Sequence, residues 1–410
     1  MNFRGKDADV IIGGGGMVGL SLALALARGG LDVVVAEPLS PAAMSNERFD
    51  GRVSALAFAA QRMFTVLGVW PRLQDLAQPI SDILISDAKL GRPPSALSLH
   101  FDHREIGEPL GHIVENRHIR QALLAALAEE KRVTLITGVT LDRLENDGAV
   151  AIATLSNGRQ IRAALCVAAD GRESALRDAH GIATISWDYP QTGIVTTVAH
   201  ERPHEGVAYE HFLPSGPFAI LPMTGNRSSL VWTEATDDAR AMMKLGSDDF
   251  AAAIALRFGG HLGRVTPIGP RWSYPLKFHL ARAYVAPRLA LVGDAAHGIH
   301  PIAGQGLNLG LKDVAALAET VLDAARLGLD FGTLDSLKRY ERWRRFDSFV
   351  VAAATDTINR LFSNDIAPLR TARDLGLGIV DRIAPLRRFF MRHAGGDVGK
   401  LPRLLKGEAA

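Results

Sequence analysis

An α/β fold, α+β over the whole chain, is predicted for these 410 residues by three observations. A strand, a glycine-rich turn, a helix and a second strand follow one another within the first 40 residues. Two later apolar runs each end in an aspartate turn, as strands of an open parallel sheet do. Between 181 and 271, short strand-like runs alternate with Pro, Gly and Asn turns, which indicates an inserted, mainly antiparallel sheet.

Composition narrows the class of protein. Hydrophobic residues make up 47% and charged residues 22%, which is ordinary for a globular protein. A net charge of +2 and 6% aromatic residues do not favour nucleic-acid binding. The single cysteine, Cys166, cannot form an internal disulfide, and charged residues near the N-terminus do not suit a signal peptide. We therefore expect a cytoplasmic protein in which Cys166 is a small buried residue.

The first strand, turn and helix carry a nucleotide-binding pattern. Residues 8–12 form the expected strand, and the turn that follows reads Gly14-x-Gly16-Met17-Val18-Gly19. Glu37 ends the second strand, 18 residues after the last glycine. In such a fingerprint the glycines admit pyrophosphate to a helix N-terminus, while the acid accepts from ribose hydroxyls. A loop that only packs against the sheet is the alternative. A carboxylate here favours FAD or NAD over NADP.

A second segment, "IRAALCVAADGRESALRDAHGI", predicts a strand that ends at Asp170-Gly171-Arg172, with a helix beginning near Ser174. Ligands collect at the carboxyl ends of parallel strands, so these residues are candidates for contact with a cofactor. Asp-Gly is also a common turn, and that interpretation stays open from this segment alone.

The third segment, "LALVGDAAHGIHPIAGQGLNLGLKDVAAL", predicts a strand over 289–292 and a helix that begins near Leu307. Asp294 follows the strand, where a carboxylate can bind sugar-like hydroxyls. Pro301 stiffens the loop, and Gly304 and Gly306 remove side chains from it. The helix N-terminus directs unpaired amides and a positive dipole end toward the loop. Such a site suits a flat, negatively charged ligand such as a reduced isoalloxazine ring.

Together these motifs resemble those of the single-component FAD-dependent aromatic hydroxylases, and the last resembles the ubiquinone-biosynthesis branch, the 2-octaprenyl-6-methoxyphenol hydroxylases and relatives. Further similar stretches include "FDGRVSALAFAAQRMFTVLGVW", "LGHIVENRHIRQALLAAL" and "FLPSGPFAILPM". The resemblance covers most of the chain from Asp9 to about Asn359. One departure is Gly13, where that family usually has an apolar strand residue, and we expect it to loosen the strand end.

This resemblance implies a para-hydroxybenzoate-hydroxylase-like architecture with a discontinuous Rossmann-like FAD-binding domain. The expected FAD-binding segments are 1–78, 100–180 and 272–370, the substrate domain comprises 79–99 and 181–271, and a basic helical segment covers 371–410.

The resemblance also assigns cofactor-binding residues. The ADP half of FAD is expected at Gly14, Gly16, Met17, Val18, Gly19 and Glu37, and adenine near Val139. The pyrophosphate is expected at Arg52 and Arg117, the ribityl chain at Asp294, and the flavin at Gly304, Gln305, Gly306, Leu307 and Asn308. Asp170 and Arg172 match a loop shared by FAD and nicotinamide. No acidic residue close in sequence is an evident ion-pair partner of Arg52 or Arg117. Surface ion pairs are nevertheless the alternative role for both.

The implied reaction is hydroxylation of a polyprenylated phenol by O2 through a flavin C4a-hydroperoxide. NADH or NADPH would visit transiently, because the chain has no second complete dinucleotide fingerprint. Pro301 and Gly304 would line the flavin face, and no metal or side-chain acid–base group is expected there. His297 and His300 are expected to form structural hydrogen bonds. Tyr209 and His211 share one face of a predicted strand and are candidates for substrate contact or for the sheet surface.

The C-terminal segment, with "IVDRIAPLRRFFMRHAGG", combines apolar and basic residues. It predicts either contact with a membrane surface, which would place the protein peripherally at the inner membrane face, or packing on the FAD domain. A quinone-biosynthesis complex is a further candidate partner. Two other functions stay open: a flavoenzyme that oxidises or reduces another apolar substrate, and an FAD-holding scaffold subunit.

Overall fold

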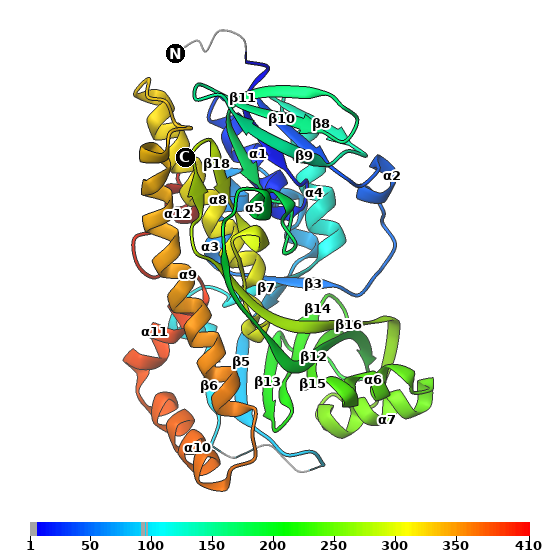
Figure 1. Ribbon diagram of the computed structural model, residues 1–410. Coiled ribbons are helices and arrows are strands. Elements are labelled where there is room, and N and C mark those ends of the chain that lie inside the picture. Colours follow the sequence, from blue (N-terminus) through cyan, green and yellow to red (C-terminus); the bar gives the residue numbers. More distant parts are fainter. Residues whose placement is uncertain (1–5, 92–94, 96) are drawn as a thin grey trace.

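The computed structural model describes residues 6–91, 95 and 97–410. Two sheets lie one above the other in Figure 1, and the long helix α9 (Leu334–Phe362) runs beside both. A smaller three-stranded sheet lies between them and consists of β3 (Val53–Leu56), β7 (Gly111–Glu115) and β4 (Gln78–Ile80).

The upper sheet is mainly parallel, as expected, and we call it the parallel sheet. Its path is β17-β18-β11-β1-β2-β8, and a β9–β10 hairpin extends it at β11. Its bounds are β1 Ala8–Gly13, β2 Val33–Glu37, β8 Val133–Thr137, β9 Leu141–Asn146, β10 Ala151–Leu155, β11 Gln160–Ala168, β17 Val285–Ala286 and β18 Leu289–Leu291. Gly13 pairs with Ala36 on one side and Ala168 on the other, so the expected loosening of the strand end is wrong.

The helices that flank this sheet begin slightly earlier than the sequence suggests. Helix α1 (Met17–Arg28) contains Gly19 in its first turn, and α8 (Gln305–Arg326) begins two residues before Leu307. Helix α5 (Ala175–Ala179) begins after Ser174 as expected, and the Ser174 hydroxyl caps it. The remaining helices and 3-10 turns here are α2 Pro41–Met44, α3 Phe58–Val66, η1 Trp70–Arg72, η2 Gln74–Leu76, η3 His103–Glu105, α4 Asn116–Ala128, η4 Gly293–Ala295 and η5 Ile302–Gly304.

The lower sheet, which we call the antiparallel sheet, has the order β19-β16-β12-β15-β14-β13-β5-β6. All of its pairings are antiparallel except β13 with β5. Its bounds are β5 Asp82–Asp87, β6 Leu99–Asp102, β12 Thr184–His200, β13 Val207–Leu213, β14 Gly216–Met223, β15 Arg227–Ala235, β16 Val265–Ala281 and β19 His297–Gly298.

Two of the expected segment boundaries fall inside elements of this sheet. Strand β6 continues past 99, and β16 passes through 271 to Ala281 without a break. Strand β16 contains Pro267, Pro270 and Pro275, and register irregularities opposite β12 accommodate them. The chain therefore passes between the two sheets within a strand rather than through a linker.

Each face of the antiparallel sheet packs against different elements. Helices α6 (Thr236–Lys244) and α7 (Ser247–Phe258), which the strand pattern did not indicate, cover one face, where Trp232 lies 6.0 Å from Phe250. The other face packs on the small sheet, because Ala208 and Met223 share an apolar cluster with Ile113.

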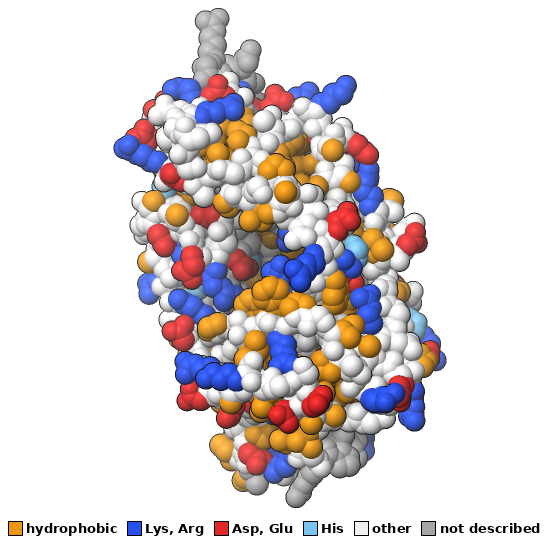
Figure 2. Space-filling model, turned by 90° about the vertical axis from the view of Figure 1, so that its right-hand side faces the viewer, with side chains coloured by type: hydrophobic (Ala, Val, Ile, Leu, Met, Phe, Trp, Pro, Cys, Tyr) orange, Lys and Arg blue, Asp and Glu red, His pale blue; other side chains and the backbone are white. Residues whose placement is uncertain are grey.

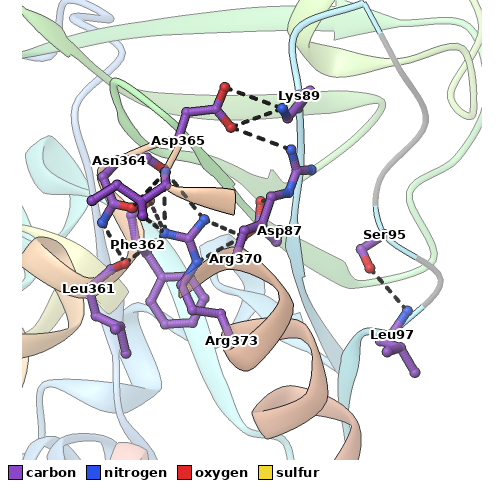
Figure 3. A network of polar contacts seen from close by, with 11 residues as sticks. Asp87, Lys89, Ser95, Leu97, Leu361, Phe362, Asn364, Asp365, Arg370 and Arg373 are labelled. Carbon is purple, nitrogen blue, oxygen red and sulfur yellow. Dashed lines mark hydrogen bonds and ion pairs between the residues drawn. The ribbon is translucent and has the colours of Figure 1, made fainter. Parts of the chain in front are cut away.

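The C-terminal segment is helical, as expected. It consists of α10 (Ala367–Arg382), α11 (Ala384–Ala394) and α12 (Arg403–Lys406). The expected boundary at 370/371 lies inside α10. Figure 3 shows how α10 is held: Arg373 pairs with Asp87 of β5 at 2.7 Å, and Lys89 pairs with Asp365 at 2.9 Å. The α9–α10 turn is thus tied to the edge of the antiparallel sheet.

Candidate active site

The glycine fingerprint turns between β1 and α1. Gly14 has φ +108°, and a Cβ there would lie 2.3 Å from the carbonyl oxygen of Ala169. A Cβ on Gly19 would lie 2.0 Å from the carbonyl oxygen of Gly14. Gly16 differs, because no atom lies within 4 Å of an added Cβ. Gly14 and Gly19 therefore allow close packing, whereas Gly16 leaves the uncapped start of α1 open to a ligand.

Glu37 lies at the end of β2 beside this turn. Its Oε2 accepts from the backbone N–H of Gly15 at 2.6 Å, and its Oε1 accepts from that of Leu39 at 2.9 Å. The backbone N–H of Val139 donates to the carbonyl of Glu37 at 3.1 Å, so the two expected ADP contacts are neighbours. The carboxylate keeps further lone pairs with which it can accept from ribose hydroxyls.

The second motif meets the first at Gly14. The close contact between Gly14 and Ala169 places the following residue, Asp170, beside the fingerprint. Asp170 is exposed, and its Oδ2 accepts from the backbone N–H of Leu176 at 3.3 Å, at the start of α5. The carbonyl of Arg172 accepts from Arg177 at 2.9 Å. The ends of β1 and β11 thus form one edge.

The third motif joins the same edge. Val18, in the first turn of α1, fits against Gly293 and Gly310, where added Cβ atoms would lie 3.2 and 2.8 Å from its methyl groups. The exposed Asp294 follows directly on Gly293. The start of α1 and the Asp294 turn are therefore packed together, although 276 residues separate Val18 from Asp294 in the sequence.

The start of α8 has the open backbone that the sequence predicted. Gly304 adopts the left-handed conformation at φ +61° and caps α8 without a side-chain bond, and no atom lies within 4 Å of a Cβ on Gly306. Pro301 precedes this turn. Asn308 is buried; its Nδ2 donates to the carbonyl of Ala55 at 2.8 Å, and its Oδ1 accepts from the N–H of Ala57 at 3.0 Å. Its amide therefore fastens α8 to β3.

Arg52 and Arg117 both have acidic partners two residues earlier. Arg52 pairs with Asp50 at 2.6 Å, and Arg117 pairs with Glu115 at 2.7 Å. The expectation that no nearby acid claims them is wrong. The sequence signal was present as Asp-x-Arg and Glu-x-Arg, but spacing alone does not show whether such side chains meet.

Tyr209 and His211 share a face of β13, but not the face that looks toward Gly304. His211 pairs across the sheet with Phe218, and Phe218 with Trp232, which lies against Phe250 of α7. The Tyr209 ring lies 4.5 Å from that of His261. Tyr209, His211 and His261 line a cavity of about 540 Å³ beside α7. Both side chains point to the α7 face of the strand, so the expectation that they contact a substrate is corrected for the flavin face.

A buried ionic cluster escaped the sequence analysis. Oδ2 of Asp313 accepts from the backbone N–H of Gly293 at 3.0 Å and bonds His297 at 2.5 Å, while Arg344 donates to Oδ1 at 2.8 Å. Burial raises the pKa of Asp313, but the charges of His297 and Arg344 outweigh it, and the pKa is lowered overall. The sequence pattern that could have revealed this cluster is an acidic residue, Asp313, on the apolar face of α8, between Leu309 and Leu317. The cluster holds the turn that presents Asp294.

His297 thus forms the structural hydrogen bond that was expected, whereas His300 does not. Both ring nitrogens of His300 are buried and have no hydrogen-bond partner among the described residues. Burial lowers the pKa of His300 to about 4, so the ring is neutral at physiological pH. The His300 ring packs edge-on against the ring of Tyr189, with 5.3 Å between the ring centroids.

A cavity of about 290 Å³ lies between the small sheet and the antiparallel sheet. Its lining residues are Arg52, Val53, Asn116, Val195, Ser229, Val231 and Tyr274. Figure 2 shows the right-hand face of the molecule, which is hollowed about midway along its length, with basic side chains beside the hollow. Strand β3 links this cavity to the loop, since a Cβ on Gly304 would lie 3.1 Å from that of Ala55.

Comparison with known proteins identifies the family. Residues 7–345 match the FAD binding domain family. The ubiquinone hydroxylase UbiL of Rhodospirillum rubrum is 51% identical over 406 residues, which cover 98% of this chain and 93% of that protein. The 3-demethoxyubiquinol 3-hydroxylase of Escherichia coli is 36% identical over 95% of this chain and 99% of its own length. This chain belongs to the FAD-dependent ubiquinone-biosynthesis hydroxylase family.

The fold agrees with that membership. The crystal structure of p-nitrophenol 4-monooxygenase from Pseudomonas putida superposes with a TM-score of 0.78 at 18% identity, covering 96% of this chain and 99% of that one. The enzyme is therefore an FAD-dependent aromatic monooxygenase with the expected fold class, and NAD(P)H is the typical reductant of its family. None of the helices in the described part of the chain combines the length and apolar character needed to cross a bilayer.

The residues present fit FAD. The start of α1 and the start of α8 are two uncapped helix N-termini, and each has a glycine with open space in front of it. The former suits a pyrophosphate and the latter the anionic edge of a reduced flavin. Asp294 lies between them with an exposed carboxylate suited to polyol hydroxyls.

Proposed function

We propose that this enzyme hydroxylates the aromatic ring of a polyprenylated phenol in ubiquinone biosynthesis, using FAD, O2 and NADH or NADPH. The observation that carries the proposal is the convergence of the three motifs at one edge, opposite a largely apolar wall of the antiparallel sheet. The names of the two ubiquinone-pathway relatives support the phenolic substrate class.

The chain's own contribution is to hold and orient. The amides of Gly16, Met17 and Val18 bind the pyrophosphate, Glu37 accepts from the ribose hydroxyls, and Val139 lies against the adenine. Asp294 binds the ribityl hydroxyls, and the backbone of residues 304–308 supports the flavin. When bound, FAD supplies the redox chemistry that activates O2. Arg52 and Arg117, paired as they are, contribute charge near the pyrophosphate only through shared ion pairs.

NAD(P)H binds at the same edge of the parallel sheet as FAD and has no separate binding domain. Asp170 lies beside the fingerprint, and the side chain of Arg172 lies near Gly298, where an added Cβ would be 3.4 Å from its Nε. We propose that both contact NAD(P)H during a brief visit. The apolar wall keeps water away from the reacting atoms. The protein therefore contributes mainly by positioning the reactants and excluding water, and the Pro301–Gly304 loop need not supply an acid–base group.

We further propose that the enzyme is a peripheral membrane protein that delivers its site to a prenylated substrate. Twelve of the twenty exposed large hydrophobic side chains in the described residues lie between Phe346 and Phe390, on α9, α10, α11 and their connections. Exposed Arg342, Arg345, Arg382, Arg388 and Arg392 lie in the same helices. Apolar and basic groups together favour an anionic lipid surface. A complex with other quinone-pathway proteins is a second use of this surface.

Deletion of the gene tests the main proposal. We expect a quinone precursor that lacks one ring hydroxyl to accumulate, and its mass and fragmentation give the ring position. The purified chain should be yellow and should transfer one oxygen atom from O2 to that precursor. An unchanged quinone pool contradicts the proposal, and a precursor altered elsewhere favours a related flavoenzyme. Restoration of the pool by a variant that cannot bind FAD favours a scaffold.

A further inference from the structure

One acidic side chain faces the catalytic side of the antiparallel sheet without a partner. A row of paired residues crosses the sheet from β5 to β16, and paired residues point to the same face. The row comprises Ile85, Glu210, Ala219, Val231, Val195 and Trp272. Every member except Glu210 is apolar or aromatic.

The two ends of this row show which way Glu210 points. The Nε1 of Trp272 donates to the backbone carbonyl of Asp50 at 2.7 Å, so that end faces the segment leading into β3. At the other end, Ile85 packs in one apolar cluster with Val53 and Ala55 of β3. Ala55 is the residue that contacts Gly304. Glu210 therefore points toward the side of the molecule that carries the flavin loop, opposite to Tyr209 and His211.

Glu210 lies close to the cavity between the sheets. Val195 and Val231 line that cavity, and Glu210 is two strands beyond Val231, about 10 Å along the sheet at ordinary strand spacing. Its side chain is only partly covered but is densely surrounded by protein atoms, as a group in a cavity wall is. Its two neighbours on that face of β13 are Ala208 and Phe212.

No charged group on the surrounding elements explains the raised pKa of Glu210. Burial alone raises the pKa of Glu210, to about 8. Several ionisable groups of the elements packed on this face are engaged with one another: Arg52 with Asp50, Arg227 with Glu115, Asp87 with Arg373 and Arg370, Arg387 with Glu105, and Asp356 with Tyr189 and Arg360. Asp374 of α10, whose Oδ1 is buried without a hydrogen-bond partner among the described residues, acts on Asp87. Tyr274 lines the cavity but lies on β16, four strands away from β13. No hydrogen-bond partner of the Glu210 carboxyl is found among the described residues.

We propose that Glu210 is the residue that binds the phenol hydroxyl of the substrate and accepts its proton; this assignment rests on the proposed function. The phenol O–H bond breaks, the proton moves to a carboxylate oxygen of Glu210, and the bonding electron pair remains on the ring oxygen. That electron density spreads to the ortho and para carbons and favours attack by an electrophilic oxygen. The proton returns to the ring oxygen when the hydroxylated product leaves.

The experiment compares wild type, Glu210→Gln, Glu210→Asp and the control His211→Gln, which alters the opposite face of the same strand. The measurements are FAD content, NAD(P)H oxidation without phenol, the anaerobic Kd of a short-chain prenylated phenol, and hydroxylation rate against pH. We expect Glu210→Gln to keep its FAD and to bind phenol within a few-fold of wild type. Its kcat should fall on the order of 100-fold, the scale of one acid–base group.

The pH profile separates proton acceptance from a structural role. A base must be ionised, so wild-type kcat/KM should rise with pH through about 8 and then level off. Glu210→Gln should lose this alkaline rise, Glu210→Asp should recover part of it, and His211→Gln should keep it. A Glu210→Gln enzyme with the wild-type rate and profile overturns the assignment and leaves the hydroxylase function standing. A wild-type enzyme that hydroxylates no phenol overturns both.

Discussion

At the scale of single residues, two glycines of one turn have separable tasks. The backbone conformation of Gly14 and its contact with Ala169 exclude any side chain, whereas Gly16 faces open space at the start of α1. The motif therefore combines one residue required by the fold with one whose open space suits the proposed pyrophosphate contact.

We expect Gly16→Ser to fold normally but to weaken FAD binding at least tenfold, because the added side chain occupies the path of the pyrophosphate. Serine remains a good N-cap, so the stability of the FAD-free protein should change by less than about 0.5 kcal/mol. Gly14→Ala should instead lose about 1–3 kcal/mol or more through backbone strain and the clash. Thermal denaturation and flavin absorbance measure the two effects. Equal loss of stability in both variants would contradict this division.

Glu210 also predicts a pH dependence of stability that needs no substrate. Its folded pKa of about 8 lies above the ordinary value of 4.5. Between these values the folded protein binds a proton that the unfolded chain lacks, so the contribution to stability falls as pH rises from about 4.5 to about 8. The difference in unfolding free energy between wild type and Glu210→Gln should fall over the same range. A difference that is independent of pH would show that Glu210 is well solvated.

At the scale of elements, α8 serves the site through both its start and its buried face. Its N-terminus is the proposed support of the flavin, and about two turns further on Asp313 holds the backbone of Gly293 and pairs with Arg344 of α9. The helix thereby fixes the position of Asp294 relative to its own N-terminus.

We expect Asp313→Ala to destabilise the protein by about 3–5 kcal/mol, because it leaves the Arg344 guanidinium buried and without its main partner. Asp335→Ala on α9 is the matched control, since that carboxylate is 94% exposed in a surface ion pair with Lys338. The control should change stability by less than about 0.5 kcal/mol. Urea denaturation of both variants measures this, and a cost below about 1 kcal/mol for Asp313→Ala would contradict it.

The elements also show where sequence patterns stop being informative. The parallel strands and their turns were predictable because Gly, Asp and Pro report local backbone requirements. Strand β16 was not predicted at its full length, and its irregular pairing with β12 tolerates the prolines that it contains. Helices α6 and α7 interrupt a region whose strands dominated the pattern. The alternation in β13 predicted two faces, but both faces are covered, so hydrophobicity alone does not show which one meets the cofactor.

At the scale of the whole molecule, the helices α9 to α11 form the left-hand edge in Figure 1, on the side away from α7. If this edge contacts anionic lipid, exposed phenylalanines should contribute more than exposed apolar residues elsewhere. Phe346 and Phe389 are 73% and 51% exposed, so their replacement removes little packing.

We expect Phe346→Ser with Phe389→Ser to weaken binding to vesicles that contain phosphatidylglycerol by about tenfold, with unchanged thermal stability. Leu327→Ser is the control, because Leu327 is 74% exposed at the far end of α8, outside this surface. Vesicle co-sedimentation measures binding, and added salt should reduce it through the arginines. Equal binding by the double variant and wild type would show that lipid contact lies elsewhere.

The sequence by itself determined the cofactor class, the family and the positions of the three motifs. It could do so because a glycine without room for a side chain, or an acid at a strand end, is a local requirement that spacing preserves. Only the tertiary structure decided that Asp50 and Glu115 pair with Arg52 and Arg117, that Asp313 is buried with Arg344, and that Glu210 rather than His211 faces the catalytic side. Each of these depends on which elements pack against which face, and a strand with two covered faces carries no mark of that choice in its own residues.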